Sequence, residues 1–122
     1  MGKKILVIED NLMNMELLSD WLEAHDFEVL QAYGALEGIE LAQTLAPDLV
    51  LMDIALPGMD GVEATRVLKK DASTAHIPII AVTASSMRVN LETLAEVGCE
   101  NVVFKPIDFE ELSTKMNEVL EA

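Results

Sequence analysis

The fold of this chain is decided by the stretch Ile5-Leu6-Val7-Ile8-Glu9-Asp10, in which four consecutive apolar side chains are followed directly by two acidic ones. A continuous apolar run of this length is typical of a strand that is buried on both faces, as the strands of a parallel sheet are. The same pattern recurs in Leu49-Val50-Leu51-Met52, which Asp53 follows. Three further segments are strand candidates, of which the first is the weakest: 28–32, 79–82 and 102–104.

Amphipathic segments lie between these runs and predict helices. In the first, Leu17, Leu18, Trp21 and Leu22 are expected to face the core, and Ser19 to face solvent. The other helices are expected around the following residues: Leu36, Ile39, Ala42 and Leu45; the segment 62–70; Leu91, Leu94 and Ala95, with Gly98 as the C-terminal cap; and Phe109, Leu112, Met116, Val119 and Leu120, with Asp108 as the N-terminal cap.

The strict alternation of strands and helices predicts an α/β fold, namely a doubly wound, five-stranded parallel sheet with helices on both faces. We expect the flavodoxin-like strand order 2-1-3-4-5, because five strands are too few for a closed eight-stranded barrel. The chain has 122 residues, which is enough for one domain with a substantial core. We therefore expect residues 1–122 to form a single domain with no output domain.

Composition excludes several classes of protein. The formal net charge of −14 would repel DNA and RNA, so we expect no nucleic-acid partner. Cys99 is the only cysteine, which rules out an internal disulfide and favours a reducing compartment. The sequence shows no signal-peptide pattern and no apolar run of membrane-spanning length. We therefore expect a cytoplasmic protein that makes no membrane contact.

Polar residues follow four of the predicted strands: Glu9 and Asp10, Asp53, Thr83, and Lys105. Because ligands bind at the carboxyl ends of parallel strands, which share one edge of the sheet, we expect these side chains to lie together. Three carboxylates at one place repel one another, and a hard cation such as Mg²⁺ would neutralise them. Asp10 and Asp53 suit direct ligation, and Glu9 could act through a bound water. With Lys105 and Thr83 nearby, Asp53 could serve as a nucleophile in phosphoryl transfer.

Each of these residues has an ordinary explanation when it is taken alone. Acidic residues such as Glu9 and Asp10 often cap the next helix, and Asp53 could be a turn residue. Thr83 could be another helix cap, and Lys105 a solvated loop residue. Their joint placement on four strand ends is what favours a functional site.

At these residues the sequence resembles the receiver domain of two-component response regulators, over essentially its whole length. Four motifs carry the resemblance: Ile8-Glu9-Asp10-Asn11, Leu51-Met52-Asp53-Ile54-Ala55-Leu56-Pro57-Gly58-Met59-Asp60-Gly61, Val82-Thr83-Ala84 and Phe104-Lys105-Pro106. The resemblance implies that Asp53 is the phosphoacceptor. It further implies that Asp10, Asp53 and the backbone carbonyl of Ala55 bind Mg²⁺, with Glu9 in support through a water.

The same resemblance implies roles for the remaining two strand ends and for the partners. Thr83 would hydrogen-bond the phosphoryl group, Lys105 would pair with it, and the Lys105–Pro106 peptide would be cis. The sequence is similar in particular to small stand-alone regulators. The phosphoryl donor would then be a sensor histidine kinase, a histidine phosphotransfer protein, or both, and the output would be binding to a downstream effector protein. Such a protein is a monomeric phosphoacceptor with self-phosphorylation and self-dephosphorylation chemistry, and no other enzymatic activity.

One position departs from the family pattern. Many receivers carry Tyr or Phe three residues before the lysine, where the ring swings inward on phosphorylation, and this chain has Val102 there. Valine is stiff and lacks the reach of a ring, and Phe104 shares its strand face. Leu12 and Met15, on the first predicted helix, are candidates for a docking face beside the site. For Met15, a place in the core is equally compatible with the pattern.

Four alternatives remain open on the sequence alone. The chain could be the receiver portion of a hybrid histidine kinase, or an interaction module that is never phosphorylated. A hydrolase of the haloacid-dehalogenase type would need a second acid two residues after the nucleophile, where Ala55 stands. A flavin carrier would need a loop rich in Ser, Thr and Gly after the first strand, where Glu9 and Asp10 would repel a phosphate.

Overall fold

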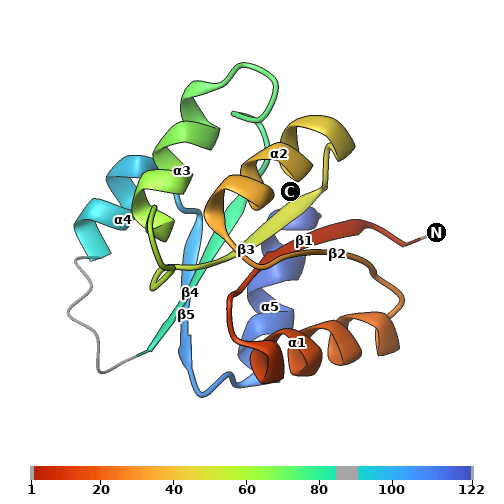
Figure 1. The fold of residues 1–122 in the computed structure, drawn as a ribbon. Helices are drawn as coiled ribbons and strands as arrows, with labels where there is room; N and C mark the ends of the chain where they lie inside the picture. Colours follow the sequence, from red (N-terminus) through yellow and green to blue (C-terminus); the bar gives the residue numbers. More distant parts are fainter. Residues whose placement is uncertain (1, 85–90, 122) are drawn as a thin grey trace.

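The computed structural model describes residues 2–84 and 91–121, in which strands and helices alternate (Figure 1). The elements are β1 (Lys4–Ile8), α1 (Leu12–Ala24), β2 (Glu28–Ala32), α2 (Ala35–Leu45), β3 (Leu49–Asp53), α3 (Gly61–Lys70), β4 (Ile79–Ala84), α4 (Leu91–Val97), β5 (Asn101–Lys105) and α5 (Phe109–Leu120). No helix in the part of the chain that the structure describes is long and apolar enough to cross a membrane.

The strands form one parallel sheet in the order β2-β1-β3-β4-β5, which confirms the predicted fold class and strand order. Helices α1 and α5 cover one face of the sheet, and α2, α3 and α4 cover the other (Figure 1). The register pairs Ile8 with Ala32 on one side and with Met52 on the other. All strands therefore end at the same edge, and so do the polar residues that follow them.

The core consists of two apolar layers, one on each face of the sheet. In β1, Leu6 and Ile8 point into the layer under α2, α3 and α4, whereas Ile5 and Val7 point into the layer under α1 and α5. Because both faces are covered, every side chain of β3 is buried as well. This double burial is the physical reason for the continuous apolar runs in the sequence.

Helix ends carry the capping residues that the sequence indicates. The Asp108 side chain accepts hydrogen bonds from the backbone N–H groups of Glu110 and Glu111, which confirms it as the cap of α5. Gly98 follows the last residue of α4 with a φ of +112°, a conformation that glycine adopts without strain. The cap of α1 is Asn11, whose side chain accepts from the Asn14 N–H at 2.9 Å, so Glu9 and Asp10 are not used as caps.

The predicted inner face of α1 is partly wrong. Leu18 and Leu22 are buried as expected, but Leu17 is 55% exposed and Trp21 is only partly buried. Ser19, expected to face solvent, is buried, and its hydroxyl accepts a hydrogen bond of 2.9 Å from the Gln31 side chain on β2. The helix is thus rotated toward β2, which places Met15 in the core, so Met15 is not available as a docking residue.

The stripe predicted for α2 is right in its middle and wrong at its ends. Ile39 and Ala42 are buried, whereas Leu36 and Leu45 are exposed. The buried residues of α2 are Ala35, Gly38, Ile39 and Ala42, so the inward face begins at the first residue of the helix and does not include Leu36. The helix lies close to β1 at Gly38, where a Cβ would collide with the Ile8 side chain.

Gly61 opens α3 directly against the end of β3. A Cβ at this position would lie 2.5 Å from the backbone oxygen of Asp53 and 2.6 Å from the Cα of Ile54. The Gly61 N–H also donates to the Ile54 carbonyl at 2.9 Å. Since these neighbours are backbone atoms, a larger residue could fit only if the end of β3, and Asp53 with it, moved.

We predict that Gly61→Ala lowers the free energy of unfolding by about 1–3 kcal/mol, the usual range for overpacking. Urea denaturation measures the change. Gly34→Ala is the matched control, because a Cβ there meets nothing within 4 Å and the φ of −158° is open to any residue. The control should stay within roughly 0.5 kcal/mol of the parent. Equal effects of the two variants would contradict the close approach.

Candidate functional site

Three acidic side chains meet where β1 and β3 end. Carboxylate oxygens of Glu9, Asp10 and Asp53 all lie within 4.8 Å of one another. Glu9 and Asp53 are buried, whereas Asp10 is exposed. The strand order explains the meeting, because β1 and β3 are neighbours and Ile8 lies opposite Met52 in their register. The predicted gathering of these three residues is therefore observed.

A single lysine faces this cluster from the far edge of the sheet. Lys105, the last residue of β5, places its Nζ 2.9 Å from Glu9 Oε2 and 3.6 Å from Asp53 Oδ2. Its side chain passes over β4 to reach them, and it retains some contact with solvent. Among the described residues, one positive charge faces three carboxylates, which leaves this group of side chains negative overall. That excess is what a divalent cation would neutralise.

The electrostatic cost of the cluster is largest at Glu9. Burial raises the pKa of the Glu9 carboxyl, and the nearby charge of Asp53 raises it further. The hydrogen bond from Lys105 opposes this shift, as does the backbone N–H of Asn11, which donates to Glu9 Oε1 at 3.2 Å. The opposition is incomplete, so the ionised form of Glu9 remains less stable than that of an ordinary glutamate. A cation placed beside Glu9 would stabilise the ionised carboxylate and lower its pKa again.

The side chain of Asp53 is held from two sides. Its Oδ1 accepts the backbone N–H of Ala55 at 3.1 Å, and its Oδ2 faces the Lys105 ammonium. Ala55 is exposed in the segment after β3, so its backbone lies at the surface beside the cluster. Its carbonyl as a metal ligand remains a prediction, and so does a water-mediated role for Glu9.

Thr83 is the remaining predicted site residue. It lies on β4, one residue past Val82, which pairs with Asp53 in the sheet, and it is fully buried. The structure thus brings it to the same edge, on the strand next to Asp53. Residues 85–90, the segment after β4 that the family resemblance would implicate in the response to phosphorylation, lie outside the described residues.

Asn11 contributes to the site in a way that its motif did not predict. Its backbone N–H donates to the Glu9 carboxylate, and its side chain caps α1. An Asn between an acidic pair and an amphipathic segment is the signal that indicates this cap. The Lys105–Pro106 peptide is cis, as the resemblance implied.

The carboxyl ends of β1 and β3, where Glu9, Asp10 and Asp53 meet, form what we call the acidic edge of the sheet. The strand order and this acidic edge together define the class of the molecule. Residues 5–117 match the model of the response regulator receiver domain, and the chain belongs to this family. Among curated proteins it is similar to the polar-differentiation response regulator DivK of Brucella ovis and of Brucella abortus. In both comparisons the identity is 44% over 107 residues, which cover 88% of this chain and 87% of the relative.

Solved structures agree with this assignment. The receiver domain of a sensor histidine kinase from Pseudomonas aeruginosa matches with a TM-score of 0.92 and 27% identity, covering 100% of both chains. That structure holds a magnesium ion in its active-site cleft. A CheY-like receiver domain protein from Methanospirillum hungatei matches with a TM-score of 0.91 and 27% identity, covering 99% of this chain and 95% of the other. Receiver domains are signalling modules of two-component systems, so the expected class is confirmed.

The Glu9–Lys105 pair gives a prediction for the metal-free protein. Lys105→Met leaves Glu9 as a buried charge without its partner, and should lower the free energy of unfolding by roughly 2–3 kcal/mol, somewhat less than for a fully buried pair. Adding Glu9→Gln to this variant should recover much of the loss. Urea denaturation of the four proteins of this double-mutant cycle measures the coupling.

The Arg66–Glu63 pair on α3 provides the control. Its atoms are 2.7 Å apart, but both side chains are well exposed, so Arg66→Met should change stability by less than about 1 kcal/mol. Additive effects of the Glu9 and Lys105 substitutions would show that the two side chains are not coupled.

Proposed function

We propose that the protein is a phosphorylation-dependent signalling switch in which Asp53 accepts a phosphoryl group from a phosphohistidine donor in a Mg²⁺-dependent reaction. One observation supports this above the others: Asp53 is a buried carboxylate with one oxygen fixed by the Ala55 N–H and the other facing the Lys105 ammonium. A carboxylate used only for capping or solubility needs no such cation beside it. The proposal makes Asp53, Thr83 and Lys105 the residues of the transfer itself.

The chemistry balances without any further reagent. An oxygen of Asp53 attacks phosphorus, a new O–P bond forms, and the P–N bond of the phosphohistidine breaks with its electron pair returning to the imidazole. A small acyl phosphate can replace this donor, in which case a P–O bond breaks and a carboxylate leaves. Lys105 balances the negative charge of the transferred oxygens, and the Thr83 hydroxyl donates to one of them once transfer is complete.

The residues present fit a magnesium ion. Three carboxylates near one another and a backbone carbonyl form the all-oxygen donor set that this ion takes, and Asp10 is open to solvent. Asp10, Asp53 and the Ala55 carbonyl would hold it directly, and Glu9 through a water. When bound, the ion supplies positive charge to the phosphoryl oxygens.

The output in this proposal is a change in protein binding. A dianion on Asp53 draws Thr83 toward it and alters the surface around α4, β5 and α5, to which a downstream effector binds. Val102 cannot act as a swinging aromatic, so this chain would transmit the change through backbone movement near Thr83. The proposal also treats the protein as a cytoplasmic monomer, in the compartment where phosphohistidine is made from ATP, with no nucleic-acid or membrane partner.

Membership of the receiver family replaces the hydrolase and flavin-carrier hypotheses. Two alternatives stay within the family. The similar structure from Pseudomonas aeruginosa is part of a sensor histidine kinase, so the same fold serves hybrid kinases too. A module that is never phosphorylated would have no need for the Lys105 contacts.

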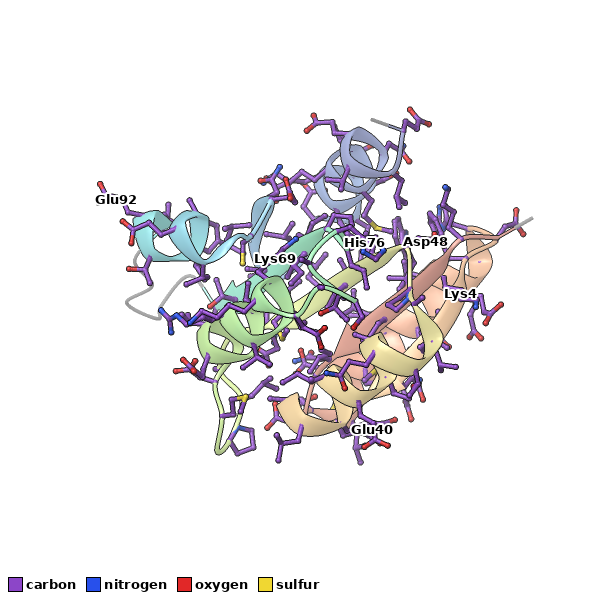
Figure 2. The ribbon with its side chains drawn as sticks, turned by 90° about the horizontal axis from the view of Figure 1, so that it is seen from above. Lys4, Glu40, Asp48, Lys69, His76 and Glu92 are labelled. Carbon is purple, nitrogen blue, oxygen red and sulfur yellow. The ribbon has the colours of Figure 1, made fainter. Side chains whose placement is uncertain are left out.

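Incubation with acetyl phosphate and Mg²⁺ should add one phosphoryl group to the intact mass. Asp53→Asn should abolish the gain, and so should a chelator. Asp48→Asn is the matched control, because Asp48 lies at the opposite end of the strands, where it accepts the Lys4 N–H at 2.8 Å (Figure 2). An unchanged gain in Asp53→Asn would overturn the assignment of the acceptor.

The exposed apolar residues of α1 predict how a protein donor docks. Leu12 and Met13 lie in the first turn, directly after the acidic edge, and are 67% and 79% exposed. Apolar side chains so placed suit contact with a partner helix that carries the phosphohistidine. Met13 takes the place that the sequence suggested for Met15, which is buried.

We expect Leu12→Ser combined with Met13→Ser to slow transfer from a phosphorylated histidine protein at least tenfold and to leave the rate with acetyl phosphate unchanged. Leu36→Ser is the control, since Leu36 is equally exposed but belongs to α2, on the other face of the sheet. Rapid-quench kinetics with both donors measure the rates. If the rate of transfer falls to the same degree with both donors, the substitutions act on the chemistry and the docking surface lies elsewhere.

A further inference from the structure

A cavity of about 190 Å³ lies between α1 and α5, away from the acidic edge. Its lining consists of Trp21 from the last turn of α1, of His25 and Phe27 from the segment between α1 and β2, and of Ser113, Met116 and Asn117 from α5. Helix α1 begins at the acidic edge and runs toward the other end of the sheet (Figure 1), and Trp21 lies in its last turn, with His25 directly after it.

The size and the walls of this cavity suit a single side chain. Sites for drug-sized molecules occupy ~300–1,000 Å³, which is more than this cavity offers. The aromatic wall is already packed: the Trp21 ring centroid lies 4.4 Å from that of His25 and 5.1 Å from that of Phe109. Met116, which is buried, forms an apolar floor. An inserted side chain would therefore meet a preformed aromatic pocket with a hydroxyl and an amide in its lining.

The surroundings of the cavity are strongly negative. Helix α1 carries three acidic residues and no basic one, and α5 carries three acidic residues and one lysine, Lys115. This lysine is already engaged, because its Nζ donates to the Val102 carbonyl at 2.7 Å and lies 3.7 Å from Glu111. One more acidic residue, Asp26, directly follows His25 in the chain.

Helix dipoles add to this field. Trp21 lies in the last turn of α1, with His25 as its C-cap, and Asn117 lies in the last turn of α5, so the cavity sits near the negative ends of both helices. Neither helix has a basic residue in its last turn. A cation in the cavity would meet aromatic side chains and the C-terminal ends of two helices that carry a net negative charge, each of which favours positive charge.

We propose that this cavity receives the side chain of an arginine from a basic protein partner. Arginine fits better than lysine, because its planar guanidinium stacks on aromatic rings and is more weakly hydrated. Leu17, which is exposed, lies one turn before Trp21 and joins the cavity to the apolar first turn of α1. The proposal goes beyond the phosphoryl chemistry and does not depend on it.

The test is an NMR titration of the isotopically labelled protein with a short peptide in which one arginine is flanked by uncharged residues. Trp21 is the only tryptophan, so its indole N–H signal reports on the cavity without ambiguity. We expect saturable shifts of this signal and of the His25, Phe27 and Asn117 amides. The same peptide with citrulline, which keeps the shape and removes the charge, should bind at least tenfold more weakly, and a leucine peptide should not bind.

Two variants of the protein sharpen the test. Ser113→Leu fills the cavity and should abolish the shifts, with the dispersion of the remaining spectrum showing that the fold is intact. Glu121→Gln removes one charge a turn beyond Asn117 and should weaken binding severalfold. Glu40→Gln removes the same charge from α2, on the other face of the sheet, and should leave binding unchanged (Figure 2).

Several outcomes would overturn the proposal. Equal binding of the arginine and citrulline peptides would show that charge is not recognised, and preferential binding of the leucine peptide would identify an apolar occupant. If the same signals shift when the concentration of the protein alone is raised, with no peptide present, the occupant is a second copy of the chain. The absence of saturable shifts at Trp21 at millimolar peptide would show that the cavity takes no arginine.

Discussion

The functional edge of this molecule depends on the confinement of three carboxylates, from Glu9, Asp10 and Asp53, within 4.8 Å of one another. Two of them are buried, and Lys105 is the one cation in contact with them among the described residues. Such an arrangement is unfavourable in isolation, as the raised pKa of Glu9 shows. A divalent cation would neutralise the excess negative charge, which is the condition that the proposed phosphoryl transfer requires.

The sheet makes this confinement possible. The middle strands β1, β3 and β4 are apolar from Ile5, Leu49 and Ile79 up to the polar residues at their ends, because both faces of the sheet are covered there and tolerate no unpaired polar side chain. The parallel register then brings all the polar residues to one edge. Gly61 adds a local condition, since it lets α3 start against the backbone of Asp53 without displacing it. The same strands therefore determine both how the core packs and where the side chains of the site lie.

The fold class, the strand order and the meeting of Glu9, Asp53 and Lys105 could be predicted from the sequence. The reason is that a strand buried on both faces appears in the sequence as a continuous apolar run, and the polar residue that ends the run marks the end of the strand. It was insufficient for the orientation of α1. Apolar residues occur on most sides of that helix, so the pattern alone could not separate Met15, which is buried, from Leu17, which is exposed. The burial of Ser19 depends on its hydrogen bond with Gln31, a tertiary contact that no local pattern reveals.

Helix α1 has exposed apolar residues beside the acidic edge, and its last turn lines an aromatic cavity. Borohydride reduction of the protein after incubation with acetyl phosphate and Mg²⁺, followed by peptide sequencing, locates any acyl phosphate as homoserine. We predict homoserine at position 53 and at no other aspartate. Homoserine at Asp10 or elsewhere, with Asp53 intact, would contradict it.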